Sequence, residues 1–203
     1  MRCTKVAKQL WKSCVVLSLA IAVAACATQA KLVPVNNSTP GTNVGWATVP
    51  PPKGSAWYAV NSPKGSAIYV KKLESSKHTF VATVITRRVS DCCADSDELL
   101  ARARAIQEEN RQDKRHRFIT QEAEITSWDG FACVSHRIVA IDQGSPNFPG
   151  EKLNFFQKGI TCLRPGSSGE VIDLTYSERN GPPEGSPTLV AEGESFLKGL
   201  KRP

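Results

Sequence analysis

The sequence predicts an α+β protein in which a mostly antiparallel sheet carries helices on both of its faces, as an α/β/α sandwich. Short runs of alternating apolar and polar residues, separated by Gly, Pro and Asn turns, are typical of antiparallel strands. Residues 78–86 are apolar on both alternating faces, so that strand should be covered on both sides. Two further segments show helix-start residues followed by an apolar stripe. A chain of 203 residues is long enough for one such domain.

The first half of the domain is predicted from a short repeat and a helix-start signal. Pro-Lys-Gly-Ser occurs at 52–55 and again at 63–66, and each copy leads into aromatic and β-branched residues. Turns of this kind launch strands, so the two copies predict a β-hairpin, with 78–86 as the third strand. A helix is expected from Asp95 to Gln112, because Glu98 follows Asp95 at the spacing of a capping box.

The second half is predicted to be mostly strand. The expected strands are Phe118–Ser127, Phe131–Asp142, Leu153–Leu163 and Val171–Arg179. A second helix is expected after Ser186-Pro187, because proline is favoured at the first helical position. The predicted order is therefore β-β-β-α-β-β-β-β-α.

This element order and the C-terminal helix are similar to the PsbP-like α/β/α sandwich family, which includes small bacterial lipoproteins. The similarity covers about residues 57–201. It consists of the element order alone, so it transfers no binding residue to this chain. It implies an accessory or binding protein and not an enzyme.

The N-terminus has the layout of a secretory signal. An apolar segment from Cys14 to Ala25 is too short for a stable spanning helix. It follows a basic head without acidic residues, which consists of Arg2, Lys5, Lys8 and Lys12. The segment ends in Val23-Ala24-Ala25-Cys26, which resembles the bacterial lipobox.

The lipobox resemblance implies that the Cys26 thiol receives a diacylglycerol, that cleavage occurs before Cys26, and that the new amino group is also acylated. Ala27 follows in place of Asp, which by resemblance to Gram-negative lipoproteins favours the outer membrane, with the domain facing the periplasm. Two other interpretations stay open. An ordinary signal could be cleaved after Ala27, or Cys26 could stand in the apolar segment by chance.

Cleavage would also change the charge of the protein. The chain has 26 basic and 19 acidic residues, a net charge of +7, and loss of the four basic residues of the head would lower it to +3. The high charge therefore belongs largely to the signal, and no nucleic-acid partner is expected.

Three segments follow from these patterns: a signal peptide at 1–25, a lipidated Cys26 with a flexible tether at 26–56, and a single domain at 57–203. The tether is predicted because residues 27–56 are rich in Pro, Asn, Thr and Gly and lack apolar periodicity. In the alternative interpretation, Trp46 and Val49 already begin the fold.

No catalytic constellation is visible in the sequence. A Gly-x-Ser-x-Gly nucleophile motif does not occur, and the three histidines fall in different predicted elements. Glu122 and Glu124 share one strand face, where alternating acids usually mark the solvent side. No catalytic residue, metal site or cofactor is therefore expected.

Four cysteines follow Cys26 and should pair in an oxidising compartment. The predicted hairpin of Phe131–Asp142 and Leu153–Leu163 brings Asp142 opposite Leu153, and the same register sets Cys133 opposite Cys162. Cys92 and Cys93 are then neighbours, either joined to each other or free. Their position before a helix leaves thiol or metal handling open as an alternative function.

The most concentrated charge of the mature chain consists of Arg111, Lys114, Arg115 and Arg117. This segment could contact anionic lipid head groups or an acidic partner. Cations are also favoured at a helix C-terminus, in which case the segment is a solvated surface.

These observations predict an exported, lipid-anchored envelope lipoprotein with a non-catalytic binding or accessory role. Its expected partners are the membrane, through the lipid, and an envelope protein or anionic envelope component. The alternative is a periplasmic enzyme whose site is assembled from distant residues.

Overall fold

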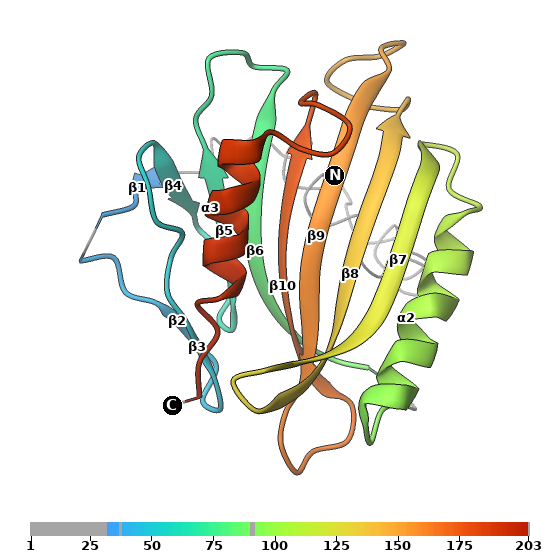
Figure 1. The fold of residues 1–203 in the computed structure, drawn as a ribbon. Coiled ribbons are helices and arrows are strands. Elements are labelled where there is room, and N and C mark those ends of the chain that lie inside the picture. The colour runs from blue at the N-terminus through green and yellow to red at the C-terminus, as the bar shows by residue number, and fades with distance from the viewer. Residues whose placement is uncertain (1–31, 37, 90–91, 203) are drawn as a thin grey trace, which may run out of the picture. The chain divides into compact units, whose positions relative to one another are not determined.

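An eight-stranded antiparallel sheet with two helices forms the part of the chain that the computed structural model describes, residues 32–36, 38–89 and 92–202 (Figure 1). The strand order is β1-β4-β5-β6-β10-β9-β8-β7, and a short second sheet pairs β2 with β3. The strands are β1 (Leu32–Pro34), β2 (Thr42–Asn43), β3 (Thr48–Val49), β4 (Trp57–Val60), β5 (Ser66–Lys71), β6 (Thr79–Arg88), β7 (His116–Trp128), β8 (Phe131–Asp142), β9 (Leu153–Leu163) and β10 (Glu170–Arg179), and the helices are α2 (Ser96–Asn110) and α3 (Pro187–Leu197). The predicted α+β class and the order of elements from β4 onward are confirmed.

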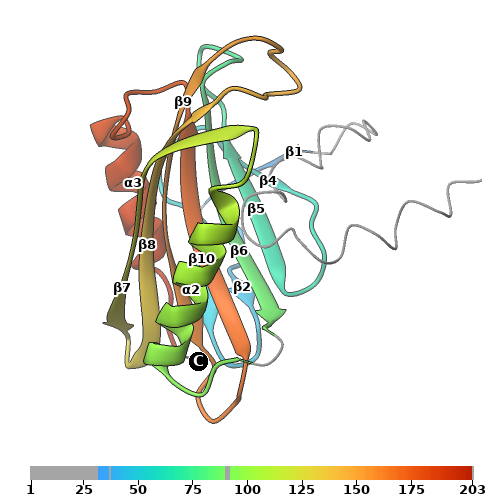
Figure 2. The ribbon, with the colours of Figure 1, turned by 90° about the vertical axis from the view of Figure 1, so that its right-hand side faces the viewer.

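The two helices cover opposite faces of the sheet, as the alternation along β10 shows. Ile172, Leu174 and Tyr176 belong to the core beneath α3, whereas Val171 belongs to a second core with Leu99 of α2. We call these the α3 face and the α2 face. Helix α3 packs on β6 and β10, and α2 packs on β7 and β8, on the other side of the strands (Figure 2).

The prediction that residues 78–86 are buried on both sides is only half right. Phe80, Ala82 and Val84 are fully buried on the α3 face. On the α2 face of the same strand, Val81 and Ile85 are only half-buried. The reason is that α2 lies over β7 and β8, at the far edge of the sheet, and not over β6.

Both helices begin where their sequence signals predict. Asp95 caps α2, because its side chain accepts hydrogen bonds from the N–H groups of Asp97 and Glu98, both at 2.9 Å. The Glu98 carboxylate in turn accepts from the N–H of Ala94 at 2.8 Å. Ser186 is the N-cap of α3, and Pro187 fills the first helical position.

The β8–β9 hairpin has the predicted register. Asp142 lies opposite Leu153, and Cys133 lies opposite Cys162. The two cysteines form a disulfide, with Cα atoms 4.0 Å apart, and both are fully buried on the α3 face. Cys92 and Cys93 are joined to each other, just before α2.

The segment expected to be a flexible tether is part of the fold in its described residues, so that prediction is wrong and the alternative holds. Strand β1 pairs with β4, and Ala47 and Val49 are fully buried in the main core. Strands of two or three residues are too short to show a period in sequence, which explains why composition alone suggested a linker. Residues 26–31 lie outside the described residues.

No helix in the described ranges is long and apolar enough to cross a membrane.

We expect a non-reducing peptide map of the exported protein to link Cys133 to Cys162 and Cys92 to Cys93, because each pair is adjacent in the fold. Tandem mass spectrometry of the peptides, with and without reductant, checks the linkage. A peptide joining either member of the hairpin pair to Cys92 or Cys93 would contradict both the pairing and the register.

Candidate functional site

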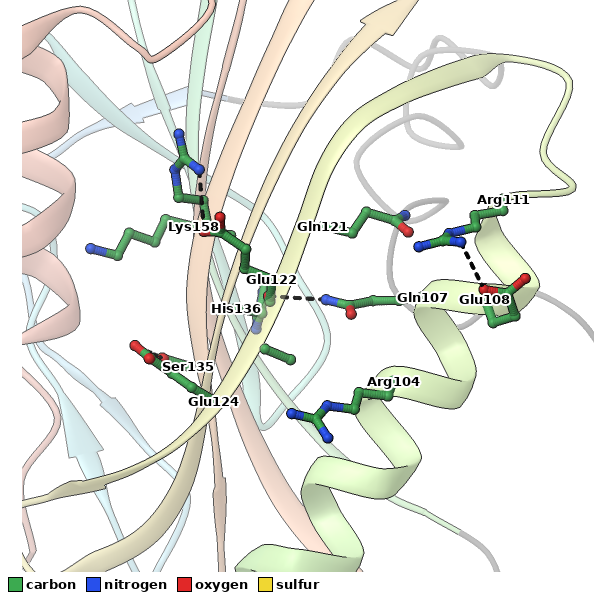
Figure 3. A pocket seen from close by; sticks show the side chains of 12 residues that line it. Arg104, Gln107, Glu108, Arg111, Gln121, Glu122, Glu124, Ser135, His136 and Lys158 are labelled. Carbon is green, nitrogen blue, oxygen red and sulfur yellow. Dashed lines mark hydrogen bonds and ion pairs between the residues drawn. The ribbon is translucent and has the colours of Figure 1, made fainter.

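A cleft of about 650 Å³ lies beside β7, the edge strand next to α2 (Figure 3). Its lining side chains lie on both sides of this strand, so the cleft reaches both faces of the sheet edge. The lining residues are Arg104, Gln107, Glu108 and Arg111 of α2, Gln121–Glu124 of β7, Ser135–Arg137 of β8, and Lys158 of β9.

One wall of the cleft is a polar stripe of α2. The stripe consists of Arg104, Gln107, Glu108 and Arg111. Their spacings of three and four residues place them on one side of the helix, next to the apolar stripe that packs on the sheet. Gln107 donates a hydrogen bond from Nε2 to the backbone oxygen of Glu122 at 3.0 Å and so ties the helix to the edge strand. Arg111 pairs with Glu108 at 3.2 Å. Arg104 is exposed and has no ion-pair partner in the described part of the chain.

The opposite wall is a ladder of charges on the α3 face. Glu122, Arg137 and Lys158 stand side by side in register across β7, β8 and β9. Arg137 pairs with Glu122 at 3.2 Å, and Lys158 pairs with Glu194 of α3 at 2.6 Å. The cleft therefore presents both signs of charge, and most of its cations already have carboxylate neighbours.

The cleft is also lined by Gln121 of β7, a polar residue without hydrogen-bond partners for its side chain among the described residues. Both polar atoms of the Gln121 side chain are buried without a hydrogen-bond partner among the described residues. Gln121 also lines a second cavity of about 520 Å³, which shares Arg111 with the first. A β-bulge between Phe118 and Thr120 precedes Gln121, and bulges of edge strands re-aim the side chains that follow. A buried amide of this kind offers donors and an acceptor to a polar ligand or to water.

His136 of β8 also lines this cleft. Burial lowers the pKa of His136, the nearby Asp173 carboxylate opposes this shift, and Arg87 adds to it. Its Nε2 atom lies 3.5 Å from Nε2 of Gln157, which is itself buried. No carboxylate orients the ring by a hydrogen bond in the described residues, so His136 lacks the partner that a general base usually has.

A buried carboxylate, Asp142, organises the residues between α2 and β7. Arg115 binds both of its oxygens, Nε to Oδ1 at 2.9 Å and Nη2 to Oδ2 at 2.7 Å, and Arg179 lies 3.0 Å from Oδ2. Burial alone would raise the pKa of Asp142, but Arg115 and Arg179 together lower it below its usual value. The same burial lowers the pKa of His116, against the effect of its hydrogen bond to Asp113 at 2.7 Å.

The four residues of the predicted basic patch lie in different environments in the structure. Arg115 is not available to a partner, because it neutralises Asp142 in the interior. Arg111 lines the cleft, whereas Lys114 and Arg117 are exposed. Sequence spacing could not show this division, because the carboxylate that binds Arg115 lies 27 residues further along the chain.

The cysteines predicted as sites, Cys92, Cys93, Cys133 and Cys162, do not line the cleft. Cys93 is fully buried in the core under α2, and its carbonyl accepts from the N–H of Gly169 at 3.2 Å. In the described ranges, no three His, Cys, Asp or Glu side chains are arranged to hold a metal ion. The lipidation residue Cys26 lies outside the described residues.

Sequence reasoning missed a second buried carboxylate, Glu178. It accepts from the backbone N–H of Ser186 at 2.7 Å and from the Ser186 hydroxyl at 2.5 Å, and His78 Nε2 lies 2.6 Å from it. In a hydrolase the serine hydroxyl would bond to the histidine, but here both groups bond to the carboxylate. The arrangement therefore fixes the start of α3 and has no activated nucleophile.

Comparisons with known proteins show the fold. No protein-family model matches the sequence, and no curated protein is significantly similar to it. Among solved structures, LpqN, involved in cell envelope biogenesis of Mycobacterium tuberculosis, matches with a TM-score of 0.51 and 15% identity over 86% of this chain and 92% of that chain. CyanoP, the cyanobacterial PsbP from Synechocystis sp. PCC 6803, matches with a TM-score of 0.37 and 10% identity over 82% and 98% of the two chains. A STAR-related lipid transfer protein from Xanthomonas axonopodis matches with a TM-score of 0.27 and 15% identity over 71% and 93%.

The fold is therefore shared with LpqN.

We expect replacement of Arg115 by Ala to lower the free energy of unfolding by about 3 kcal/mol, because it leaves a buried carboxylate with only one cation. The neighbouring Lys114→Ala should change it by less than about 0.5 kcal/mol, because Lys114 is exposed. Urea unfolding followed by circular dichroism measures both. Equal effects of the two substitutions would contradict the structural role of Arg115.

Proposed function

We propose that this protein is an exported, lipid-anchored component of a bacterial cell envelope, where it binds another envelope protein and catalyses no reaction. The observation that carries the proposal is the order of parts at the N-terminus. A basic head, an apolar segment and two alanines precede Cys26, and the folded sheet begins at Leu32. This is the arrangement of a domain held at a membrane by lipid.

The cleft beside β7 supports a protein partner over a simple anion. Four cations and three carboxylates line it, and of the four cations only Arg104 has no ion-pair partner in the described part of the chain. An anion-binding site would need an excess of cations that are not already neutralised. Ile119 and Ile125 of the same strand are 58% and 46% exposed, which adds apolar surface of the kind that protein interfaces use.

The fold supports an accessory role in the envelope. LpqN, which has this fold, is involved in cell envelope biogenesis. The groups that an enzyme could use are instead bonded into the interior: Glu178 holds Ser186 and His78, and Asp142 holds Arg115. Thiol chemistry through Cys92 and Cys93 has less support, because the two residues are joined and Cys93 is buried.

If the protein is lipid-anchored, acylation and removal of the signal peptide both require Cys26. Inhibition of the lipoprotein signal peptidase should cause the unprocessed chain to accumulate, and Cys26→Ser should abolish the mass added by acyl chains, because the thiol carries the lipid. Intact mass spectrometry of the membrane fraction measures both. A mature protein of unchanged mass in both experiments would refute lipidation.

The cleft predicts where the partner binds. A photoreactive amino acid at Ile125 should capture a single envelope protein in cells, whereas the same probe at Leu32, an equally exposed residue of the opposite edge strand, should not.

Adding Arg104→Glu to the Ile125 probe should lower the yield of the cross-linked product about tenfold if a carboxylate of the partner meets this cation. Lys72→Glu makes the same charge change outside the cleft and should leave the yield unchanged. Equal capture from both edges, or equal effects of both reversals, would contradict the assignment.

A further inference from the structure

The covalent distance between the proposed lipid and the fold is short. Only residues 27–31 separate Cys26 from Leu32, the first residue of β1. Six residue steps span at most about 20 Å even when fully extended. A flexible chain as far as residue 56 would have averaged roughly 30 Å and could have stretched much further. The entry of the chain into the sheet at β1 therefore limits how far the domain can lie from the lipid.

The edge at which the chain enters is also apolar on its outside. Leu32 and Val33 are 51% and 50% exposed. Leu32 lies opposite Val60, so this edge continues into the turn that joins β4 and β5 and carries the exposed Lys64. The other exposed large hydrophobic residues in the described ranges, Ile119 and Ile125, lie on β7. The two pairs thus occupy the two opposite edges of one sheet.

We infer that the β1 edge lies against the lipid bilayer and that the β7 edge, with the cleft, points away from it. The inference rests on the lipid anchor of the proposed function. Apolar side chains and a lysine are the residues that a membrane interface accommodates, with the apolar atoms below the head groups and the cation among them. Eight strands leave seven spacings between the edges, so β7 lies about 34 Å across the sheet from β1, beyond the reach of the short linker.

Quenching of tryptophan by brominated lipid tests this orientation. The lipidated protein, purified from membranes, is reconstituted in vesicles of phosphatidylethanolamine and phosphatidylglycerol that contain dibrominated phosphatidylcholine. Tryptophan is introduced as Val33→Trp or, at a similarly exposed site of the other edge, as Ile125→Trp. The signal of the parent protein, which contains Trp46, Trp57 and Trp128, is subtracted.

We expect the added quenching at residue 33 to exceed that at residue 125 by roughly threefold or more, because the sheet separates the two sites. Leu32→Trp provides a second probe of the β1 edge should Val33→Trp fold poorly, as circular dichroism would reveal.

The outcomes separate this inference from the function on which it rests. Equal quenching at both edges in vesicle-bound protein overturns the orientation and leaves the lipid anchor intact. If the protein purified from membranes floats with vesicles no better than Cys26→Ser, the anchor itself fails, and the orientation with it.

Discussion

The structure depends on one constraint: the eight-stranded sheet has apolar side chains on both of its faces, and other elements must cover each face to remove those side chains from water. Alternate residues of the central strands divide between two cores, as Ile172 and Val171 do in β10 and Cys162 and Leu163 do in β9. Helix α3 covers the larger core over β6 and β10, and α2 covers the smaller one at β7 and β8. The helices are offset across the sheet, which leaves the α2 face of β6 half-buried and creates a cleft where α2 meets the edge strand.

Buried carboxylates join the loops at one end of this sheet. Asp142, at the end of β8, binds Arg115 of the α2–β7 connection and Arg179 at the end of β10. Glu178, one residue before Arg179, binds Ser186 at the start of α3 and His78 before β6. A buried charge that loses its partner is costly, so these contacts specify how the loops close. These buried carboxylates and their partners therefore hold the loops of the fold together.

The edges of the sheet are the surfaces left for function. Strand β7 is long, contains a bulge and borders the cleft, whereas β1 has three residues and lies where the chain enters the fold. When one edge of a sheet stands against a flat surface, the opposite edge points away from it, so an anchor at one edge leaves the other free for a partner. A rigid sheet can in this way orient a binding site without a long linker.

The sequence by itself determined the fold class, most strands and both helices, because period-two alternation, the Asp95 cap and Ser186-Pro187 are local signals. It also predicted the register of the β8–β9 hairpin, because setting the strand ends Asp142 and Leu153 opposite each other places Cys133 opposite Cys162. It could not assign residues 32–56 to the fold, because their strands are too short to be periodic and are ordered by β4 and the core. Nor could it separate Arg115 from its neighbours or find the cleft. Ion pairs and cavities depend on side chains that are far apart in the chain, and only the packing of α2 against β7 and β8 brings them together.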